Sequence, residues 1–147
     1  MLDCVKNIGF LYPHQHYREG FSLKKVFAVI LALALCMNGT AWAYSVADTS
    51  IYVGEEGLTS IDVTPCTELD YLGCQQNKLT SLDLSKNTVL TVLDCAENKL
   101  TGLDLSKNTL LETLYCGDNQ LTALDLSKNT VLSYVACSDN KLTSLIL

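Results

Sequence analysis

A block of 21 residues that recurs along the chain constrains the fold more than any other feature of the sequence. Each copy begins with a leucine, at positions 58, 79, 100, 121 and 142. Four complete repeats therefore occupy residues 58–78, 79–99, 100–120 and 121–141, and a partial repeat occupies residues 142–147. A repeat of this length is typical of solenoids, in which each copy forms one coil and buries its apolar side chains against the next.

Each block contains two copies of one pattern, LxxLxL and then LxxLxC, and an asparagine follows each copy three residues later. In residues 79–99 the block reads LTSLDLSKNTVLTVLDCAENK. Apolar residues at every second position point to one side of an extended strand. Asparagine tolerates a tight turn and bonds to the backbone groups that the turn leaves open. We therefore predict a β-rich solenoid of parallel stacked strands with about four to five coils.

The repeats resemble the leucine-rich repeats of bacterial surface proteins, in particular the 21-residue class with a cysteine in the strand motif, as in cysteine-bearing internalins. The resemblance covers residues 58–147, and every complete repeat in that range carries the motif. It implies that residues 71–75, 92–96, 113–117 and 134–138 form the parallel strands of a concave face. It also implies that the chain binds macromolecules, and it implies no catalytic residue and no cofactor.

The segment before the first repeat carries a degenerate copy of the strand motif. Ile51 and Val53 lie one period before Leu72 and Cys74. We therefore predict that residues 44–57 form an N-terminal capping strand, because a solenoid needs its first coil covered.

Four of the seven cysteines recur once per repeat, at Cys74, Cys95, Cys116 and Cys137. This spacing predicts an inward column of reduced thiols that packs as small apolar residues. Disulfides are the first alternative, but neighbouring sulfurs at the strand spacing of about 4.8 Å lie too far apart for a bond of about 2.05 Å. Metal binding is the last, because sulfurs in one line cannot form a tetrahedral cage. Cys66 takes the place of the asparagine found in later repeats.

Residues 23–43 have the features of a secretory signal peptide. Lys24 and Lys25 precede an apolar run over residues 26–37, and the triplet Ala41-Trp42-Ala43 follows. We predict cleavage after Ala43 and a secreted or cell-surface location. The alternative is a membrane anchor through residues 26–43, although the apolar run is short for a span of roughly 20 residues.

Residues 1–22 are predicted to be an over-extended or non-structural N-terminus, since signal peptides rarely begin so far before their basic pair. His14 and His16 in this segment have the spacing of a metal-binding pair, but no second ligand pair lies nearby. We therefore predict no metal site.

Residues 44–147 carry six lysines against 14 aspartates and glutamates, a net charge of −8. Such an acidic body is repelled by phosphate backbones, so nucleic acid is not a predicted partner. The same residues contain no histidine, and no nucleophile–base pair, phosphate loop or zinc spacing is present. We therefore predict that the chain is not an enzyme and uses no cofactor.

Function must then come from the side chains that point outward from the predicted strands. Tyrosines among small and acidic residues are typical of surfaces that contact proteins or glycans, although they also occur on solvated strands. The predicted binding residues on the strands and on the rim after them are Tyr71, Asp94, Thr113, Tyr115, Tyr134, Glu97, Asp118 and Asp139. We predict an exported adhesion or recognition module that binds a protein or glycan on a cell surface.

The alternative prediction is a structural fragment of a longer surface adhesin without independent activity. In the partial last repeat Ile146 replaces the repeated aspartate, and no polar cap follows. An uncapped coil exposes apolar side chains and a strand edge, which favours self-association through this end.

Overall fold

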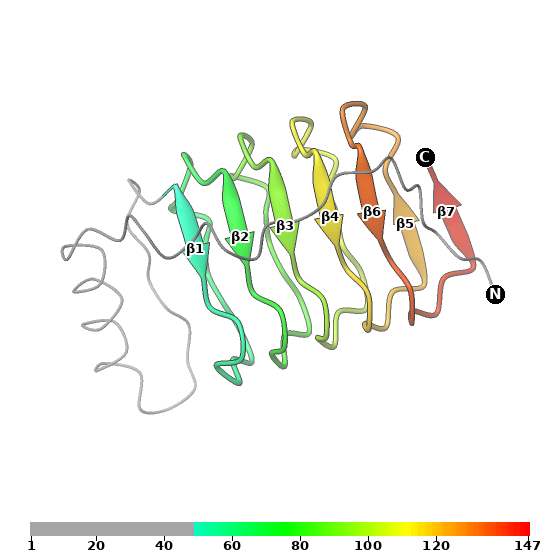
Figure 1. The fold of residues 1–147 in the computed structure, drawn as a ribbon, viewed down its shortest axis with the longest axis horizontal. Helices are drawn as coiled ribbons and strands as arrows, with labels where there is room; N and C mark the ends of the chain where they lie inside the picture. Colours follow the sequence, from blue (N-terminus) through cyan, green and yellow to red (C-terminus); the bar gives the residue numbers. More distant parts are fainter. Residues whose placement is uncertain (1–48) are drawn as a thin grey trace.

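The computed structural model describes residues 49–147, which form seven short strands and no helix. Figure 1 shows the strands following one another along the molecule. Their bounds are β1 (Ser50–Tyr52), β2 (Tyr71–Gly73), β3 (Val92–Asp94), β4 (Thr113–Tyr115), β5 (Ala123–Asp125), β6 (Tyr134–Ala136) and β7 (Ser144–Ile146). Over residues 49–147 there is accordingly no helix of the length and apolarity that a membrane crossing requires.

Several of the predictions concern residues outside this range. These are the non-structural segment 1–22 with its histidines, the signal peptide 23–43 with cleavage after Ala43, the alternative anchor 26–43, and the first residues of the predicted cap, 44–48.

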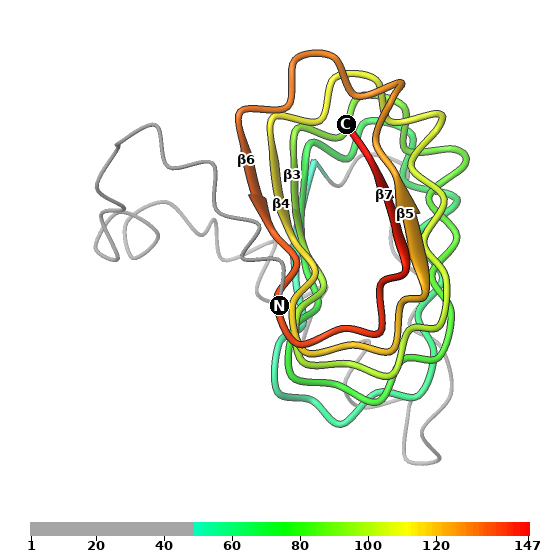
Figure 2. The ribbon, with the colours of Figure 1, turned by 90° about the vertical axis from the view of Figure 1, so that its right-hand side faces the viewer.

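The strands form two parallel sheets, with the order β1-β2-β3-β4-β6 in the first and β5-β7 in the second. The register between neighbours in the first sheet is one repeat: Leu72 lies opposite Leu93, and Leu93 lies opposite Leu114. Viewed along the stack, the chain traces an elongated ring with β3, β4 and β6 on one side and β5 and β7 on the other (Figure 2). This arrangement confirms the predicted leucine-rich-repeat solenoid of parallel stacked strands.

The strands of the first sheet begin where the pattern places them but are three residues long, whereas five were predicted. The parallel ladder of hydrogen bonds continues past them, since Cys74 N–H donates to Asp94 O (2.7 Å) and Gln76 N–H donates to Ala96 O (3.0 Å). Regular strand geometry then ends at a residue with positive φ, as at Gln76 (55°) and Glu97 (53°). The chain turns there because a left-handed residue cannot continue a strand.

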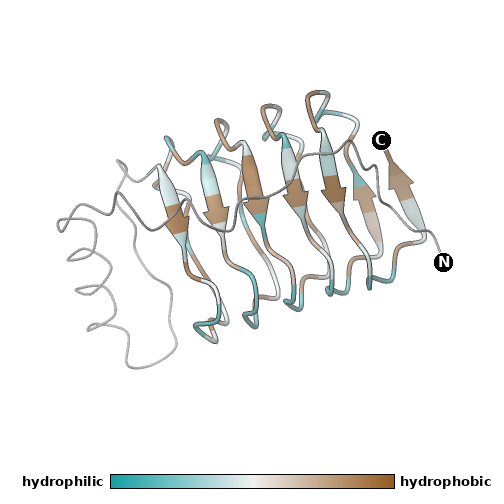
Figure 3. Ribbon diagram, in the orientation of Figure 1, coloured by the Kyte–Doolittle hydropathy of each residue, from teal (hydrophilic) through white to brown (hydrophobic). Residues whose placement is uncertain are grey.

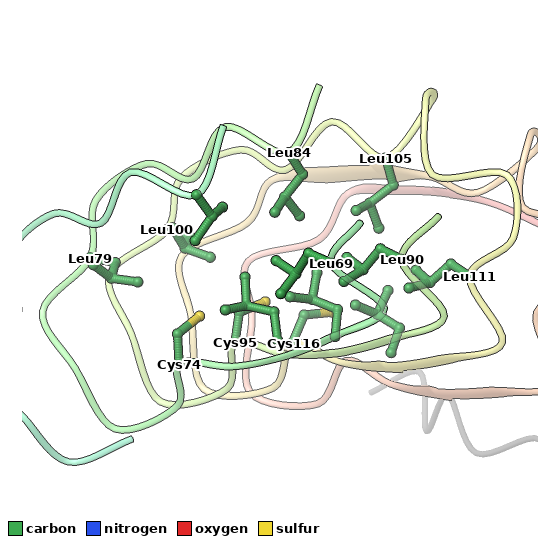
Figure 4. Packing of buried hydrophobic residues seen from close by; sticks show 14 of the residues in the cluster. Leu69, Cys74, Leu79, Leu84, Leu90, Cys95, Leu100, Leu105, Leu111 and Cys116 are labelled. Atoms are coloured by element: carbon green, nitrogen blue, oxygen red, sulfur yellow. The ribbon is translucent and has the colours of Figure 1, made fainter. Parts of the chain in front are cut away.

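The core consists of aligned leucines from successive coils. The middle residues of the strands form one inward column, and Figure 3 shows apolar residues recurring at the same level from strand to strand. Figure 4 shows leucines from both halves of the coil meeting in the interior. The largest fully buried side chains are Leu69, Leu72, Leu79, Leu84, Leu90, Leu93, Leu100, Leu105, Leu111, Leu114, Leu121 and Leu124.

The repeated cysteines form a buried column of reduced thiols, as predicted. Cys74, Cys95, Cys116 and Cys137 form no disulfide and are at most 4% exposed, and Cys66 is also buried and forms no disulfide. In Figure 4 the labelled thiols follow one another from coil to coil. Burial, and secondarily the charge of Asp94, raises the pKa of the Cys74 thiol to about 12, and burial raises the pKa of Cys95 well above its usual value. These thiols therefore stay protonated at neutral pH and pack as apolar groups.

A column of asparagines closes the turns after the first sheet. Asn98 Nδ2 donates to Cys74 O (3.0 Å) in the preceding coil and to Cys95 O (3.2 Å) in its own coil. Its Oδ1 accepts the N–H of Leu79 (3.0 Å). Asn77, Asn119 and Asn140 repeat this pattern. Each amide therefore ties two coils together while it satisfies buried backbone groups.

A second column of asparagines lies in the other half of each coil and is bonded less completely. Asn108 Nδ2 donates to Leu84 O (3.2 Å) and to Asn87 O (2.9 Å). The Oδ1 atoms of Asn87, Asn108 and Asn129 are buried without a hydrogen-bond partner. The asparagines at corresponding positions of the two halves therefore differ in their hydrogen bonds: the first column is bonded at both Oδ1 and Nδ2, and the second at Nδ2 alone.

Candidate binding face

We call the outward side of the first sheet the five-strand face. Its side chains are those that flank the inward-pointing middle residue of each strand, because alternate residues of a strand point to opposite sides. They are Ser50, Tyr52, Tyr71, Gly73, Val92, Asp94, Thr113, Tyr115, Tyr134 and Ala136. Four of these ten positions carry tyrosine and one carries a charge, so the face is aromatic with a single carboxylate on its strands.

At one end of the face two tyrosines from neighbouring strands pack together. The ring centroids of Tyr115 on β4 and Tyr134 on β6 lie 5.1 Å apart, and the ring planes are tilted by 45°. This is a favourable distance for an aromatic pair, which adds about 0.5–1.5 kcal/mol beyond the area it buries. Both side chains are partly exposed and therefore keep surface for a partner.

At the other end two further tyrosines lie over a glycine. A Cβ atom added at Gly73 would stand 2.8 Å from Cδ2 of Tyr52 and 3.0 Å from the hydroxyl of Tyr71. Gln75 Nε2 donates to the Tyr52 hydroxyl (2.9 Å) and fixes that ring further. Any side chain at position 73 would displace the rings, so the glycine is required for this aromatic group.

Asp94 lies between the two aromatic groups. In the sheet register it stands opposite Gly73 on β2 and opposite Tyr115 on β4. Its Oδ1 accepts the N–H of Ala96 (3.2 Å). Partial burial is the main reason why the pKa of Asp94 is raised; Glu97 raises it further, and the Ala96 hydrogen bond acts in the opposite direction.

The rim after the strands carries the other predicted acidic residues. Glu97, Asp118 and Asp139 are exposed, and each has a φ of 53°. Glu97 Oε1 accepts a hydrogen bond from Gln76 Nε2 (3.0 Å), the residue one coil earlier. Left-handed backbone is uncommon for residues other than glycine, asparagine and aspartate, and these rim residues adopt it at the same place in successive coils.

The structure brings five of the predicted residues together on one face: Tyr71, Asp94, Thr113, Tyr115 and Tyr134. Glu97, Asp118 and Asp139 lie beside it as a separate row. The sequence analysis missed Tyr52 and Gln75. Tyr52 could have been found, because the alignment of Ile51 with Leu72 also places Tyr52 opposite Gly73.

The opposite side of each coil has a different kind of acidic row. Asp83 Oδ1 accepts the N–H of Ser85, and Asp104 and Asp125 do the same with Ser106 and Ser127, all at 2.9 Å. These hydrogen bonds are the main reason why the pKa of each aspartate is lowered, and the neighbouring lysine contributes least. The aspartates of this row therefore stabilise the turns in which they lie. Within residues 49–147 no group of three or more histidine, cysteine or acidic side chains is arranged to hold a metal ion.

The 21-residue period, the parallel register and the buried thiol column define a leucine-rich-repeat solenoid with a cysteine ladder. Among solved structures the chain is similar to the functional domain of InlJ from Listeria monocytogenes, which includes a cysteine ladder. The two are 37% identical with a TM-score of 0.64, over 72% of this chain and 27% of that one.

The chain is also similar in fold to the internalin InlF from Listeria monocytogenes. The identity is 20% and the TM-score is 0.55, over 68% of this chain and 35% of the other. The chain therefore spans about a third or less of the length of these two structures. No protein-family profile and no curated protein sequence matches it.

Proposed function

We propose that this chain is an exported binding module that recognises a protein or glycan on a cell surface through its five-strand face. The observation that carries the proposal is the gathering of Tyr52, Tyr71, Tyr115 and Tyr134 on one side of one parallel sheet. Tyrosine supplies large contact area at a low cost in side-chain entropy and is enriched at binding hot spots. The similarity to a cysteine-ladder functional domain and to an internalin supports the same class of function.

The distribution of variable residues supports this assignment as well. On the opposite side the outward positions repeat the same residues, with aspartate at 83, 104 and 125 and lysine at 86, 107 and 128. On the five-strand face the corresponding columns change from coil to coil. Because the coils stack with different residues at these outward strand positions, the varied face is the part of the repeat that is free to fit a partner.

We propose a binding role without catalysis. The buried thiols are protonated and lie away from the five-strand face, so they do not serve as nucleophiles. Among residues 49–147, the single charged side chain on the strands of that face is Asp94, and the sequence from residue 44 onward holds no histidine to act with it. The acidic body also makes nucleic acid an unsuitable partner.

The test is a binding screen with the purified chain, using a glycan array and a pull-down from cell-surface fractions. The double substitution Tyr115→Ala, Tyr134→Ala should weaken capture of the partner by at least about tenfold, since hot-spot truncations cost roughly 2 kcal/mol or more. Lys107→Ala on the opposite side is the matched control and should leave capture unchanged. Equal capture by the double variant and the original chain would show that the five-strand face is not the binding surface.

Export is part of the proposal and rests on the signal-peptide pattern of residues 23–43. N-terminal sequencing of the protein recovered outside the cytoplasm should begin at residue 44. Recovery of an intact chain in the membrane fraction would instead favour the anchor through residues 26–43.

Self-association through β7 is a second candidate. Ile146 and Leu147 are 48% and 67% exposed, and β7 pairs with β5 on one edge only. Such an apolar strand edge can pair with a second copy. Size-exclusion chromatography distinguishes the candidates: end-to-end oligomers favour this one, and a monomer at high concentration argues against it.

A further inference from the structure

The five-strand face holds a carboxylate between two aromatic groups, and this arrangement indicates which chemistry the partner presents. We propose that the partner is a protein that inserts a basic side chain, arginine or lysine, at Asp94 between the two tyrosine groups. This inference rests on the proposed binding function and specifies the partner of the same face.

The first argument is the state of the carboxylate. Asp94 is half-buried on its strand, with the N–H of Ala96 as a hydrogen-bond donor to Oδ1. The nearby carboxylate of Glu97, which is also negative, raises the pKa of Asp94 further. A partly desolvated carboxylate beside a second negative charge gains more from an incoming cation than a fully exposed one does.

The second argument is the aromatic surroundings. Tyr115 stands opposite Asp94 in the register and packs against Tyr134 at 5.1 Å between ring centroids. On the other side Gly73 stands opposite Asp94, and the rings of Tyr52 and Tyr71 lie over that glycine. Cations bind over the faces of tyrosine rings, and a guanidinium can stack on a ring while it donates to a carboxylate.

The third argument is charge complementarity over the whole described body. Residues 49–147 carry six lysines against 13 acidic residues, a net charge of −7. Three of these acidic residues, Glu97, Asp118 and Asp139, are exposed on the rim beside the face. A field of this sign attracts a basic segment and accelerates its encounter with the face. A neutral glycan would stack on the rings and donate hydroxyl hydrogen bonds to the carboxylate, but it carries no charge for this field to attract.

The experiment uses the ¹⁵N-labelled chain and two peptides, acetyl-Gly-Arg-Gly-Arg-Gly-amide and the same peptide with citrulline in place of arginine. Citrulline keeps the shape of arginine without its charge. The arginine peptide should shift the amide signals of Gly73, Ala96 and Tyr115 in a saturable way. The citrulline peptide should bind at least about tenfold more weakly, as expected for the loss of a charge-assisted pair.

The substitution Asp94→Asn should weaken binding of the arginine peptide by about tenfold or more. Asp104→Asn makes the same charge change on the opposite side and should weaken it by less than twofold. Tyr115→Phe keeps the ring and should preserve binding, whereas Tyr115→Leu should weaken it several-fold, because the attraction between the cation and the ring face is lost. Far-UV circular dichroism checks that each variant keeps the fold.

Equal binding of the arginine peptide by Asp94→Asn and the original chain would overturn the inference. So would equal binding of the citrulline peptide, or shifts at the same amides caused by the neutral oligosaccharide chitotetraose and not by the arginine peptide. The proposed function fails separately. If the double tyrosine variant no longer binds a surface partner but Asp94→Asn still binds it, the face is the binding surface and the inference of a basic side chain at Asp94 is wrong.

Discussion

The two halves of each coil are built on the same pattern, yet they differ in what holds them and in what they display. In the half that carries the first sheet, the inward position holds a cysteine and the asparagine amide is bonded at both its oxygen and its nitrogen. In the other half the inward position holds a leucine and the asparagine oxygen has no partner. The outward residues vary in the first half and repeat in the second.

The asparagines are therefore fully hydrogen-bonded in the half with the first sheet and only partly hydrogen-bonded in the other half. The first half continues as a sheet through five coils, so its coils must stay in register. An amide that bonds two coils and accepts a backbone N–H contributes to that register directly. The tightly held half is also the one that carries the varied aromatic face, and a rigid sheet keeps such a face preorganised for binding.

The largest expected effect comes from removing an asparagine of the fully bonded column. Asn98→Ala should lower the free energy of unfolding by about 2–4 kcal/mol, because the buried N–H of Leu79 loses its acceptor and several carbonyls lose a donor. Urea denaturation followed by circular dichroism measures the change. A loss below about 1 kcal/mol would show that the amide contributes little to the register.

The thiol column comes next. Cys95→Leu should lower the free energy of unfolding by about 1–3 kcal/mol, because Cys95 is fully buried and a larger side chain has no space in a close-packed interior. The leucine at the corresponding position of the other half provides the reverse test, since Leu105→Cys leaves a cavity and is also expected to be destabilising. If Cys95→Leu raised the thermal midpoint of unfolding, the inward position of the first half would have room for a leucine, and the proposed difference between the two halves would be wrong.

A smaller effect is expected in the partly bonded asparagine column. Asn108→Cys should lower the free energy of unfolding by only about 1 kcal/mol. The substitution removes two hydrogen bonds, but it also removes a buried oxygen that has no partner, and this partly offsets the loss. The chain contains its own precedent in Cys66, which occupies this column in the first repeat. The measured cost should stay clearly below that of Asn98→Ala. Equal costs would contradict the proposed difference between the columns.

The smallest effect concerns the exposed turn aspartates. Hydrogen bonds from the following serine lower the pKa of Asp104, so its stabilising contribution is present above the ordinary value of 3.8 and is lost as the pH falls below it. Asp104→Asn keeps a side-chain acceptor for Ser106 but cannot titrate. The urea midpoint of this variant should therefore fall less than that of the original chain between pH 5 and pH 2, scanned in roughly half-unit steps. Parallel curves would exclude a contribution from this turn.

Much of the fold could be predicted because every coil poses the same packing problem. The spacing of Leu72, Leu93 and Leu114 determines the inward column, and the cysteine column follows from the same arithmetic. The two asparagine columns could not be told apart. Whether an amide oxygen meets a backbone N–H depends on how the turn is closed three-dimensionally, and the residue type is the same in both halves.

The candidate face could be predicted in part. Tyr71, Tyr115 and Tyr134 follow from the register alone. Tyr52 was missed because its coil lacks the leucine pattern, although the alignment of Ile51 with Leu72 already places it opposite Gly73. The half-buried state of Asp94 has no sequence signal either, because it arises where side chains of neighbouring coils surround one carboxylate.

The one-repeat register has a consequence for the growth of such a molecule. Because each coil meets the next through the same column of partners, duplication or deletion of a whole 21-residue unit leaves every remaining junction intact. Each added unit would lengthen the sheet by about 4.8 Å and supply fresh outward positions without any redesign of the interior. An insertion of another length within a strand motif would misalign the inward leucines of that coil, so recombination in whole units is a direct route by which this surface can be enlarged.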